Sequence, residues 1–360
     1  MIYLHQDFWQ KNLCFNRLKK YILKLIETSN FLKAAKLGKF GTQRTGQLLM
    51  HILKLNKINR LYSTMHMKRG MEFMDALLKE LEVNFEFVEE ELDRIPKEGP
   101  FITISNHPYG GIDGLILLRI ITEIRPDFKI LGNFLLQQIE PIREYIMGVN
   151  PFETHKGVRS SFSGLKSALN HLKDENSLGI FPAGEVSTYH SGSKTITDRQ
   201  WQDSALKFIK KAQIPVIPVY FKGTNSHLFH MLGVIHPLLR TVRLPSELFN
   251  KKNKTIKLRI GHPISVSEQE DFSDLSKYGR FLRIKTYALG SPLEVKKFFR
   301  PSLRREKKEE EIINPINPEL INNEVDRIGD YLLFQNKNFK VYCAPSIEIP
   351  NTITEIGRLR

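Results

Sequence analysis

The feature that most constrains the fold is an alternation of short apolar runs with helical stretches between residues 85 and 265. Strands that alternate with helices over this length favour a largely parallel sheet. We therefore expect an α/β domain with a mostly parallel mixed sheet flanked by helices, and functional loops after the strand ends. The predicted strands lie at residues 85–88, 101–105, 128–131, 178–181, 216–221 and 256–260, and the predicted helices at 114–124, 135–146, 161–173 and 203–212.

Basic amphipathic helices are expected to precede this domain. Apolar residues recur at helical spacing in residues 18–26 and again in residues 48–58, with Lys and Arg nearby, and a third helix is expected around residues 71–81. Residues 1–60 contain twelve Lys or Arg and only two acidic residues, so they carry most of the net charge of +15. This pattern predicts helices that lie on an anionic membrane surface. The alternative is a set of ordinary helices with a solvated charged face.

The chain divides into four parts on composition. Residues 1–84 form the basic helical region, 85–299 the α/β domain, 300–330 a charged linker, and 331–360 a C-terminal segment too short for a core of its own. The sequence contains no run of 18 apolar residues, so no transmembrane helix is expected, and no signal peptide is expected either. Cys14 and Cys343 are far apart in sequence, which fits a reducing cytoplasm rather than a disulfide framework.

The first motif is residues 105–114, which follow an apolar strand and precede an apolar helix. His107 is expected on a Gly-rich turn, where Gly110 and Gly111 allow close approach of a substrate beside Asn106. Asp113 can cap the helix and hydrogen-bond to His107, which would leave the other ring nitrogen free as a general base. The alternative is a capped turn with a structural histidine.

The second motif is residues 179–187, where another apolar strand ends in a turn containing Phe181, Pro182 and Gly184. Glu185 and Ser187 are candidates for holding polar groups of a substrate. The alternative is a simple β-turn.

Two further segments follow the same arrangement. Lys156 and Arg159 stand just before a predicted helix, where they would suit a phosphate or carboxylate, unless they belong to a solvated loop. Residues 214–221 read as a core strand. In the uncharged run that follows, the apolar residues are expected to pack in the core, with an acyl pocket as the alternative, and its three histidines have no nearby carboxylate or Cys to make a metal site.

Taken in order, these four segments resemble the four motif blocks of the glycerolipid acyltransferase superfamily, which includes glycerol-3-phosphate and lysophosphatidate acyltransferases. The resemblance covers residues 85–265 and implies that His107 is the base, that Asp113 orients it, and that Lys156 and Arg159 bind the acceptor. It implies an acyl-ACP or acyl-CoA donor as co-substrate, a lyso-lipid acceptor, and no metal or other cofactor. The basic helices are similar to that family's docking helices, which implies a peripheral protein on the cytoplasmic face of the inner membrane.

Two departures from the usual pattern resemble a hemolysin-type subgroup related to acyltransferases that make ornithine and other aminoacyl lipids. Five residues separate His107 from Asp113, where the family usually has four, and Ala183 replaces the usual Glu of the third block. The resemblance thus implies that the acceptor is a lysophospholipid or a lyso-aminoacyl lipid. Residues 331–360 resemble the opening of a GNAT-like N-acyltransferase domain.

Two other classes of function remain as alternatives. The altered third block also fits a catalytically inactive membrane adaptor. The net charge fits a nucleic-acid-binding protein, but such a protein would interleave aromatic residues with exposed basic ones, whereas these basic residues alternate with an aliphatic face. No nucleic acid partner is therefore expected.

Overall fold

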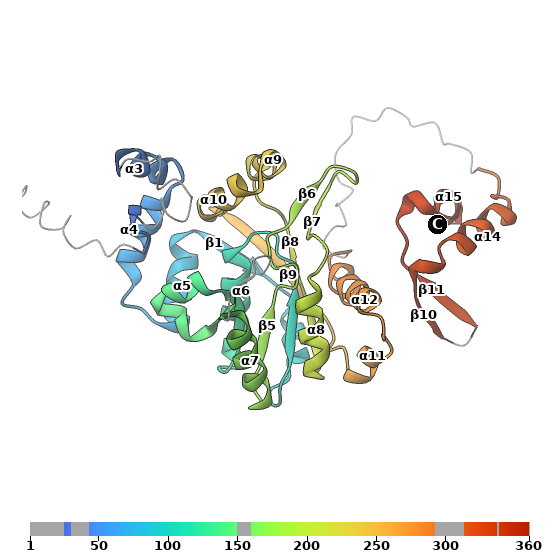
Figure 1. Ribbon diagram of the computed structural model, residues 1–360, viewed down its shortest axis with the longest axis horizontal. Coiled ribbons are helices and arrows are strands. Elements are labelled where there is room, and N and C mark those ends of the chain that lie inside the picture. Colours follow the sequence, from blue (N-terminus) through green and yellow to red (C-terminus); the bar gives the residue numbers. More distant parts are fainter. Residues whose placement is uncertain (1–24, 30–42, 150–159, 292–312, 337, 360) are drawn as a thin grey trace, which may run out of the picture.

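A seven-stranded sheet forms the centre of the protein (Figure 1). The computed structural model describes residues 25–29, 43–149, 160–291, 313–336 and 338–359. The strand order is β1 (Val83–Glu86), β9 (Lys254–Ile260), β8 (Val216–Lys222), β2 (Ile102–Ser105), β5 (Leu178–Ile180), β3 (Lys129–Asn133) and β4 (Ile146–Val149). Neighbouring strands are parallel except for β8 and β9, which are antiparallel. The predicted fold class, a mostly parallel mixed sheet, is confirmed.

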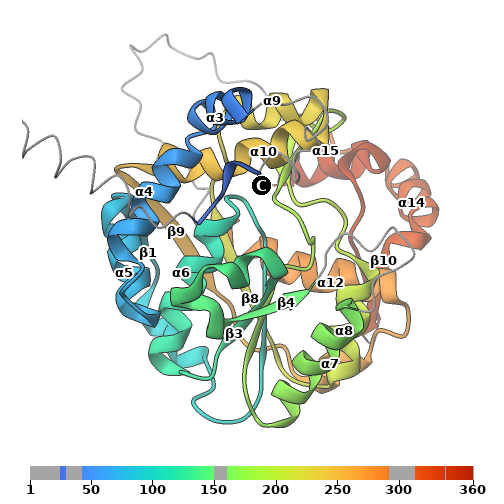
Figure 2. The same cartoon turned by 60° about the vertical axis from the view of Figure 1, so that its left-hand side comes forward.

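Helices cover both faces of this sheet and bury a separate apolar core on each (Figures 1 and 2). One core packs α5 (Gly70–Glu80) and α6 (Gly111–Ile124) against the sheet. The other packs α7 (Ser160–Lys173), α8 (Asp203–Ala212) and α12 (Leu275–Ala288), with the short α11 (Val266–Glu270) nearby in sequence. Because side chains alternate along a strand, the adjacent residues Val216 and Ile217 of β8 belong to different cores.

The helices before the sheet are shorter than their apolar pattern predicts. The repeat at residues 48–58 is split into α3 (Gln43–Ile52) and α4 (Leu55–Met65), because Lys54 adopts a left-handed conformation with φ of 59°. The apolar side of α4 is buried, whereas Leu48 and Ile52 on α3 are exposed. Most of the repeat at residues 18–26 lies outside the described residues.

The single helix predicted over residues 135–146 is wrong. The segment forms two 3₁₀ helices, η3 (Phe134–Gln138) and η4 (Glu140–Tyr145), and β4 begins at Ile146. Pro141 explains the break, because its ring removes a backbone N–H and clashes with the preceding turn of a continuous helix. A further 3₁₀ helix, η2 (Glu89–Arg94), follows β1.

Core packing was also the wrong expectation for most of the uncharged run after β8. This run forms α9 (His227–Ile235), followed by α10 (Pro237–Glu247) and η5 (Leu248–Lys251). The α9 side chains of Leu228, Met231, Val234 and Ile235 are between 48% and 70% exposed, and Phe229 is buried. Both ribbon views place α9 and α10 at the same end of the molecule as α3. A hairpin of β6 (Thr188–His190) and β7 (Thr195–Thr197) also lies outside the main sheet.

The predicted linker over residues 300–330 contains a helix, α14 (Pro318–Arg327). Asn317 caps it by accepting the Glu319 backbone N–H at 3.0 Å, and Pro318 occupies the first turn, where proline suits a helix start. The chain continues through η6 (Gly329–Tyr331), a hairpin of β10 (Leu332–Asn336) and β11 (Phe339–Tyr342), η7 (Ser346–Glu348) and α15 (Pro350–Leu359). Arg280 of α12 donates to the Asp330 carbonyl at 3.0 Å, so this segment contacts the α/β domain.

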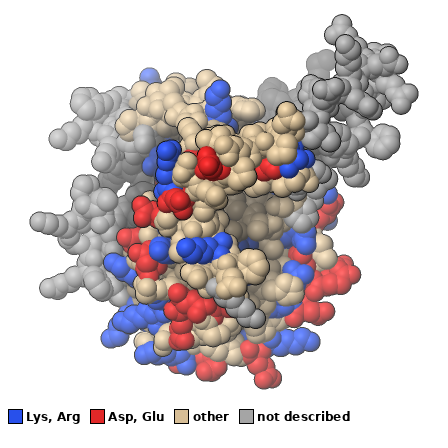
Figure 3. Space-filling model, turned by 90° about the vertical axis from the view of Figure 1, so that its right-hand side faces the viewer, with Lys and Arg blue, Asp and Glu red and all other residues tan. Residues whose placement is uncertain are grey.

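No helix among the described residues is long and apolar enough to cross a membrane. On the face shown in Figure 3, acidic and basic side chains are interspersed over the lower half.

Candidate active site

His107 lies on the turn between β2 and α6, and its neighbours fix this turn to the rest of the sheet. The Asn106 side chain donates to the Phe221 carbonyl at 2.9 Å and accepts the Phe221 N–H at 2.7 Å. The His107 N–H donates to Asp198 Oδ1 at 3.1 Å, and the His107 carbonyl accepts the Ser187 N–H at 2.9 Å. Asn106 is therefore a buried brace between β2 and β8 rather than a residue that lines the cavity.

Asp113 both caps α6 and faces His107, as its position in the sequence predicted. Its Oδ2 accepts the backbone N–H groups of Tyr109 at 2.9 Å and Gly110 at 3.0 Å. The same oxygen lies 3.0 Å from His107 Nδ1, although the approach is off the line of a hydrogen bond. Such contacts between catalytic groups are often poorly aligned before a substrate binds. The carboxylate favours the tautomer with a proton on Nδ1, which leaves Nε2 free to accept one.

The electrostatics of this turn follow from burial. Burial raises the pKa of the fully buried Asp113 carboxyl, and the contacts with His107 and the two N–H groups oppose that rise. Lys251 is buried on the other side of Tyr109, with its ammonium 4.7 Å from the centre of the ring. Burial lowers the pKa of Lys251 to about 8, despite the nearby Glu247.

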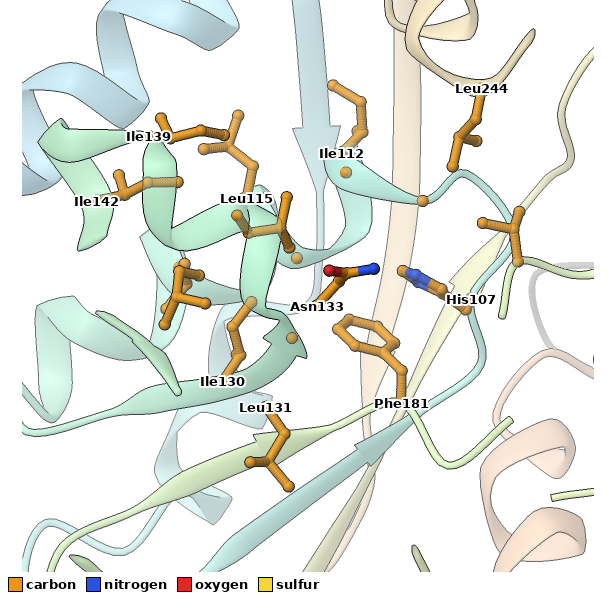
Figure 4. A pocket seen from close by; sticks show the side chains of 18 of the residues that line it. His107, Ile112, Leu115, Ile130, Leu131, Asn133, Ile139, Ile142, Phe181 and Leu244 are labelled. Atoms are coloured by element: carbon orange, nitrogen blue, oxygen red, sulfur yellow. The ribbon is translucent and has the colours of Figure 1, made fainter. Parts of the chain in front are cut away.

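A cavity of about 640 Å³ lies beside His107. Its walls come from α4, α5, α6, β3, the 3₁₀ segments and α10, and they are mostly aliphatic. Figure 4 shows Asn133 and Phe181 next to His107, with Leu115, Ile130 and Ile142 beyond Asn133 and Leu244 on the opposite side of His107. The Phe181 ring packs on the imidazole, with 4.1 Å between ring centroids. The candidate base, His107, thus lines a cavity whose volume is typical of ligand sites and whose apolar walls suit an acyl chain.

The second motif reaches the same cavity through Phe181, Pro182, Gly184 and Glu185, as do Gly110 and Gly111 of the first. Glu185 forms ion pairs with Arg240 and, at 3.2 Å, with Arg199.

Ser187 does not line the cavity. Its side chain is buried, and its hydroxyl donates to Asp198 Oδ1 at 2.6 Å. Its expected role with a substrate group therefore finds no support, because its hydroxyl is used inside the fold. Lys156 and Arg159 lie outside the described residues.

The sequence analysis missed two residues at the site, Asp198 and Arg240, because neither belongs to a recognisable motif. Asp198 holds the His107 main chain and the Ser187 hydroxyl, although it follows a short strand with no motif. Arg240 lines the cavity from α10. Each comes from a segment far from His107 in sequence, so only the fold brings them together.

Gly110 is the glycine on which the geometry of the turn depends. Its φ of 90° and ψ of −121° strain any residue with a side chain, and a Cβ there would lie 3.1 Å from Leu244 Cδ1. We expect Gly110→Ala to lower the free energy of unfolding by about 1–3 kcal/mol and to reduce activity through a displaced His107. Urea denaturation and an acyl-transfer assay measure the two effects.

Gly111→Ala is the matched control. Gly111 is helical, and its added Cβ would meet only Leu248 Cδ2 at an ordinary 3.8 Å. Its stability should stay equal or rise by up to about 1 kcal/mol, since alanine favours a helix over glycine. An equal fall in the free energy of unfolding of both variants would contradict this account of the turn.

Comparisons with known proteins identify the family of this chain. A family model described as Acyltransferase matches residues 12–296. The lyso-glycine lipid O-acyltransferase of Phocaeicola vulgatus is 25% identical over 287 residues, covering 78% of this chain and all of that protein. The protein of the same name in Bacteroides thetaiotaomicron is 25% identical over 274 residues, covering 74% of this chain and 97% of that protein.

Two matches to other acyltransferases were also found. The 1-acyl-sn-glycerol-3-phosphate acyltransferase of Borreliella burgdorferi is 28% identical over 178 residues, covering 46% of this chain and 66% of that protein. The crystal structure of the 1-acyl-sn-glycerophosphate acyltransferase PlsC from Thermotoga maritima matches with a TM-score of 0.41 and 17% identity, covering 78% of this chain and 98% of that one.

The family match spans most of the chain and includes every cavity residue named above. It ends before the C-terminal segment that begins at α14. The chain belongs to this acyltransferase family.

Proposed function

We propose that this enzyme transfers a fatty acyl group from a thioester donor, acyl-ACP or acyl-CoA, to a hydroxyl of a lyso-lipid. The observation that carries the proposal is the position of His107, backed by a buried carboxylate, in the wall of a mostly apolar cavity of about 640 Å³. The names of the relatives, two lyso-glycine lipid O-acyltransferases and a 1-acyl-sn-glycerol-3-phosphate acyltransferase, support a lyso-lipid acceptor.

The proposed chemistry is direct transfer. His107 Nε2 takes the proton from the acceptor hydroxyl as its oxygen attacks the thioester carbonyl. The tetrahedral intermediate then expels the thiolate, which receives the proton from His107. Asp113 is the positioning residue that keeps Nδ1 protonated.

Part of the Gly-rich turn is used inside the fold rather than for the substrate. The N–H groups of Tyr109 and Gly110 donate to Asp113, so they do not serve an oxyanion. The negative charge of the intermediate would instead develop near Gly111, which begins α6 and lines the cavity. A helix N-terminus favours negative charge there.

The test incubates purified protein with acyl-ACP or acyl-CoA and a panel of lyso-lipids, and identifies products by mass spectrometry. We expect one new ester on a lyso-lipid hydroxyl and release of free thiol. Absence of transfer from both donors to every acceptor would sink the proposal.

We also propose that the enzyme works as a peripheral protein on an anionic membrane surface, on the cytoplasmic face. Exposed apolar side chains on α3 and α9 support this, because both helices lie at the same end of the molecule and part of α10 lines the cavity. A fully buried large apolar side chain contributes about 1.5–3 kcal/mol.

Exchanging Met231 and Ile235 together for Ser should therefore weaken binding to anionic vesicles about tenfold or more, measured by sedimentation. The matched control exchanges Phe339 and Ile347 of the C-terminal segment for Ser. These side chains are 76% and 82% exposed, and their exchange should leave vesicle binding unchanged. If both double variants bind as the unaltered protein does, α9 does not contact the membrane.

A further inference from the structure

Arg240 is a buried cation at the cavity wall, in a part of the chain outside the four motif segments. Its residue exposure is 6%, and it lines the same cavity as His107. One guanidinium nitrogen, Nη2, donates to Glu185 Oε2. The other, Nη1, is buried and has no hydrogen-bond partner within the described part of the chain. An unsatisfied buried donor is costly, and the cost is larger for a charged group.

The guanidinium is held in place before any substrate arrives. Gly233 of α9 makes room for it, because a Cβ at that position would lie 3.0 Å from Arg240 Cδ. The Phe229 ring centre lies 6.0 Å from the guanidinium carbon. Leu244, one helical turn further along α10, lies against the Gly110 turn beside His107. The same face of α10 therefore reaches both the cation and the catalytic turn.

Arg240, Arg199 and Glu185 together carry a single positive charge. Glu185 is shared between Arg240 and Arg199, and the Arg199 side chain is 52% exposed. Two cations and one carboxylate give a net charge of one. A monoanion that accepts hydrogen bonds would balance this group and satisfy Nη1, whereas a cation would be repelled.

We propose that Arg240, braced by Glu185, binds a free carboxylate on the headgroup of the acceptor. The inference rests on the proposed function and names the substrate class of that site. If the headgroup is glycine, it must be joined to the lipid through its nitrogen, because joining through its carboxyl would leave an ammonium group. Glu185 thus acts through Arg240 rather than by holding the acceptor itself.

The experiment compares three acceptors of matched chain length: a hydroxyl-bearing N-acylglycine, its methyl ester, and a lysophosphatidate. For the unaltered enzyme we expect a KM about ten- to a hundredfold lower for the free acid than for the ester, the range of a charge-assisted hydrogen bond. Arg240→Gln should raise the KM for the free acid by the same factor. It should leave the KM for the ester and the kcat for both nearly unchanged, and Arg240→Lys should fall between.

Arg119→Gln is the matched control. Like Arg240, Arg119 is an arginine on a helix that forms ion pairs. Its partners are Asp75 and Glu123, and it does not line the cavity. It should keep the preference of the unaltered enzyme for the free acid.

The outcomes separate this inference from the proposed function. Transfer to neither glycine acceptor nor lysophosphatidate would refute the proposed function itself. Transfer to acid and ester with equal KM in the unaltered enzyme would overturn only the Arg240 subsite, whatever the variants do. A preference for lysophosphatidate that Arg240→Gln abolishes would show a phosphate site instead of a carboxylate site.

Discussion

Replacing His107 with Ala should reduce acyl transfer by about 10²–10⁴-fold, because general base catalysis contributes that much and no other histidine lines the cavity within the described residues. The loss should appear in kcat and kcat/KM alike, since proton removal belongs to the transition state. The fold should survive, because the His107 side chain is partly exposed and Asn106 and Asp198 hold its main chain. Thiol release from the donor, followed with a lyso-lipid present, measures the rate.

His262→Ala is the control, since His262 is exposed and lies outside the cavity. It should keep full activity. A well-folded His107→Ala protein that turns over at the unaltered rate would refute the mechanism.

Substitutions of Asp113 should separate two tasks that one carboxylate performs. Asp113→Ala leaves two buried backbone N–H groups without an acceptor, so the free energy of unfolding should fall by about 2 kcal/mol or more, and activity should be lost as well. Asp113→Asn keeps an oxygen of the same reach. It should therefore lose less stability than the Ala variant while losing comparable activity, because a neutral amide no longer favours the productive tautomer of His107.

Glu123→Gln, at an exposed position on the same helix, controls for a general effect of removing a carboxylate from α6. Thermal unfolding and the acyl-transfer assay, applied to all three variants, give the comparison. If Asp113→Asn retains normal turnover, Asp113 is only a helix cap.

Periodicity predicted six of the seven strands of the sheet, all but β4, and the helices α6, α7 and α8, because local pattern determines them. The residues 203–212 predicted as a helix match α8, and the strands lie within a few residues of their expected positions. The contact between His107 and Asp113 could also be predicted, since a short turn necessarily brings its two ends together. Each of these features depends on residues that are close in sequence.

The remaining features depend on contacts between distant segments. An apolar repeat shows that a helix has an apolar side but not what covers it, so the exposed face of α9 was mistaken for core. Arg240 lies more than 130 residues after His107, and no spacing rule relates them. The assignment of Ser187 was similarly limited, because only the fold reveals that Asp198 takes its hydroxyl.

The double use of Asp113 has a consequence for interpreting the sequences of relatives. A lineage that no longer needs the reaction would still gain from an acid that closes the first turn of α6, so selection for folding alone would retain it. The histidine has no such second task, because its main chain, not its ring, makes the bonds that brace the turn. In a relative of unknown competence, the aspartate therefore indicates that the turn is built in this way, and only the histidine indicates that the enzyme still works.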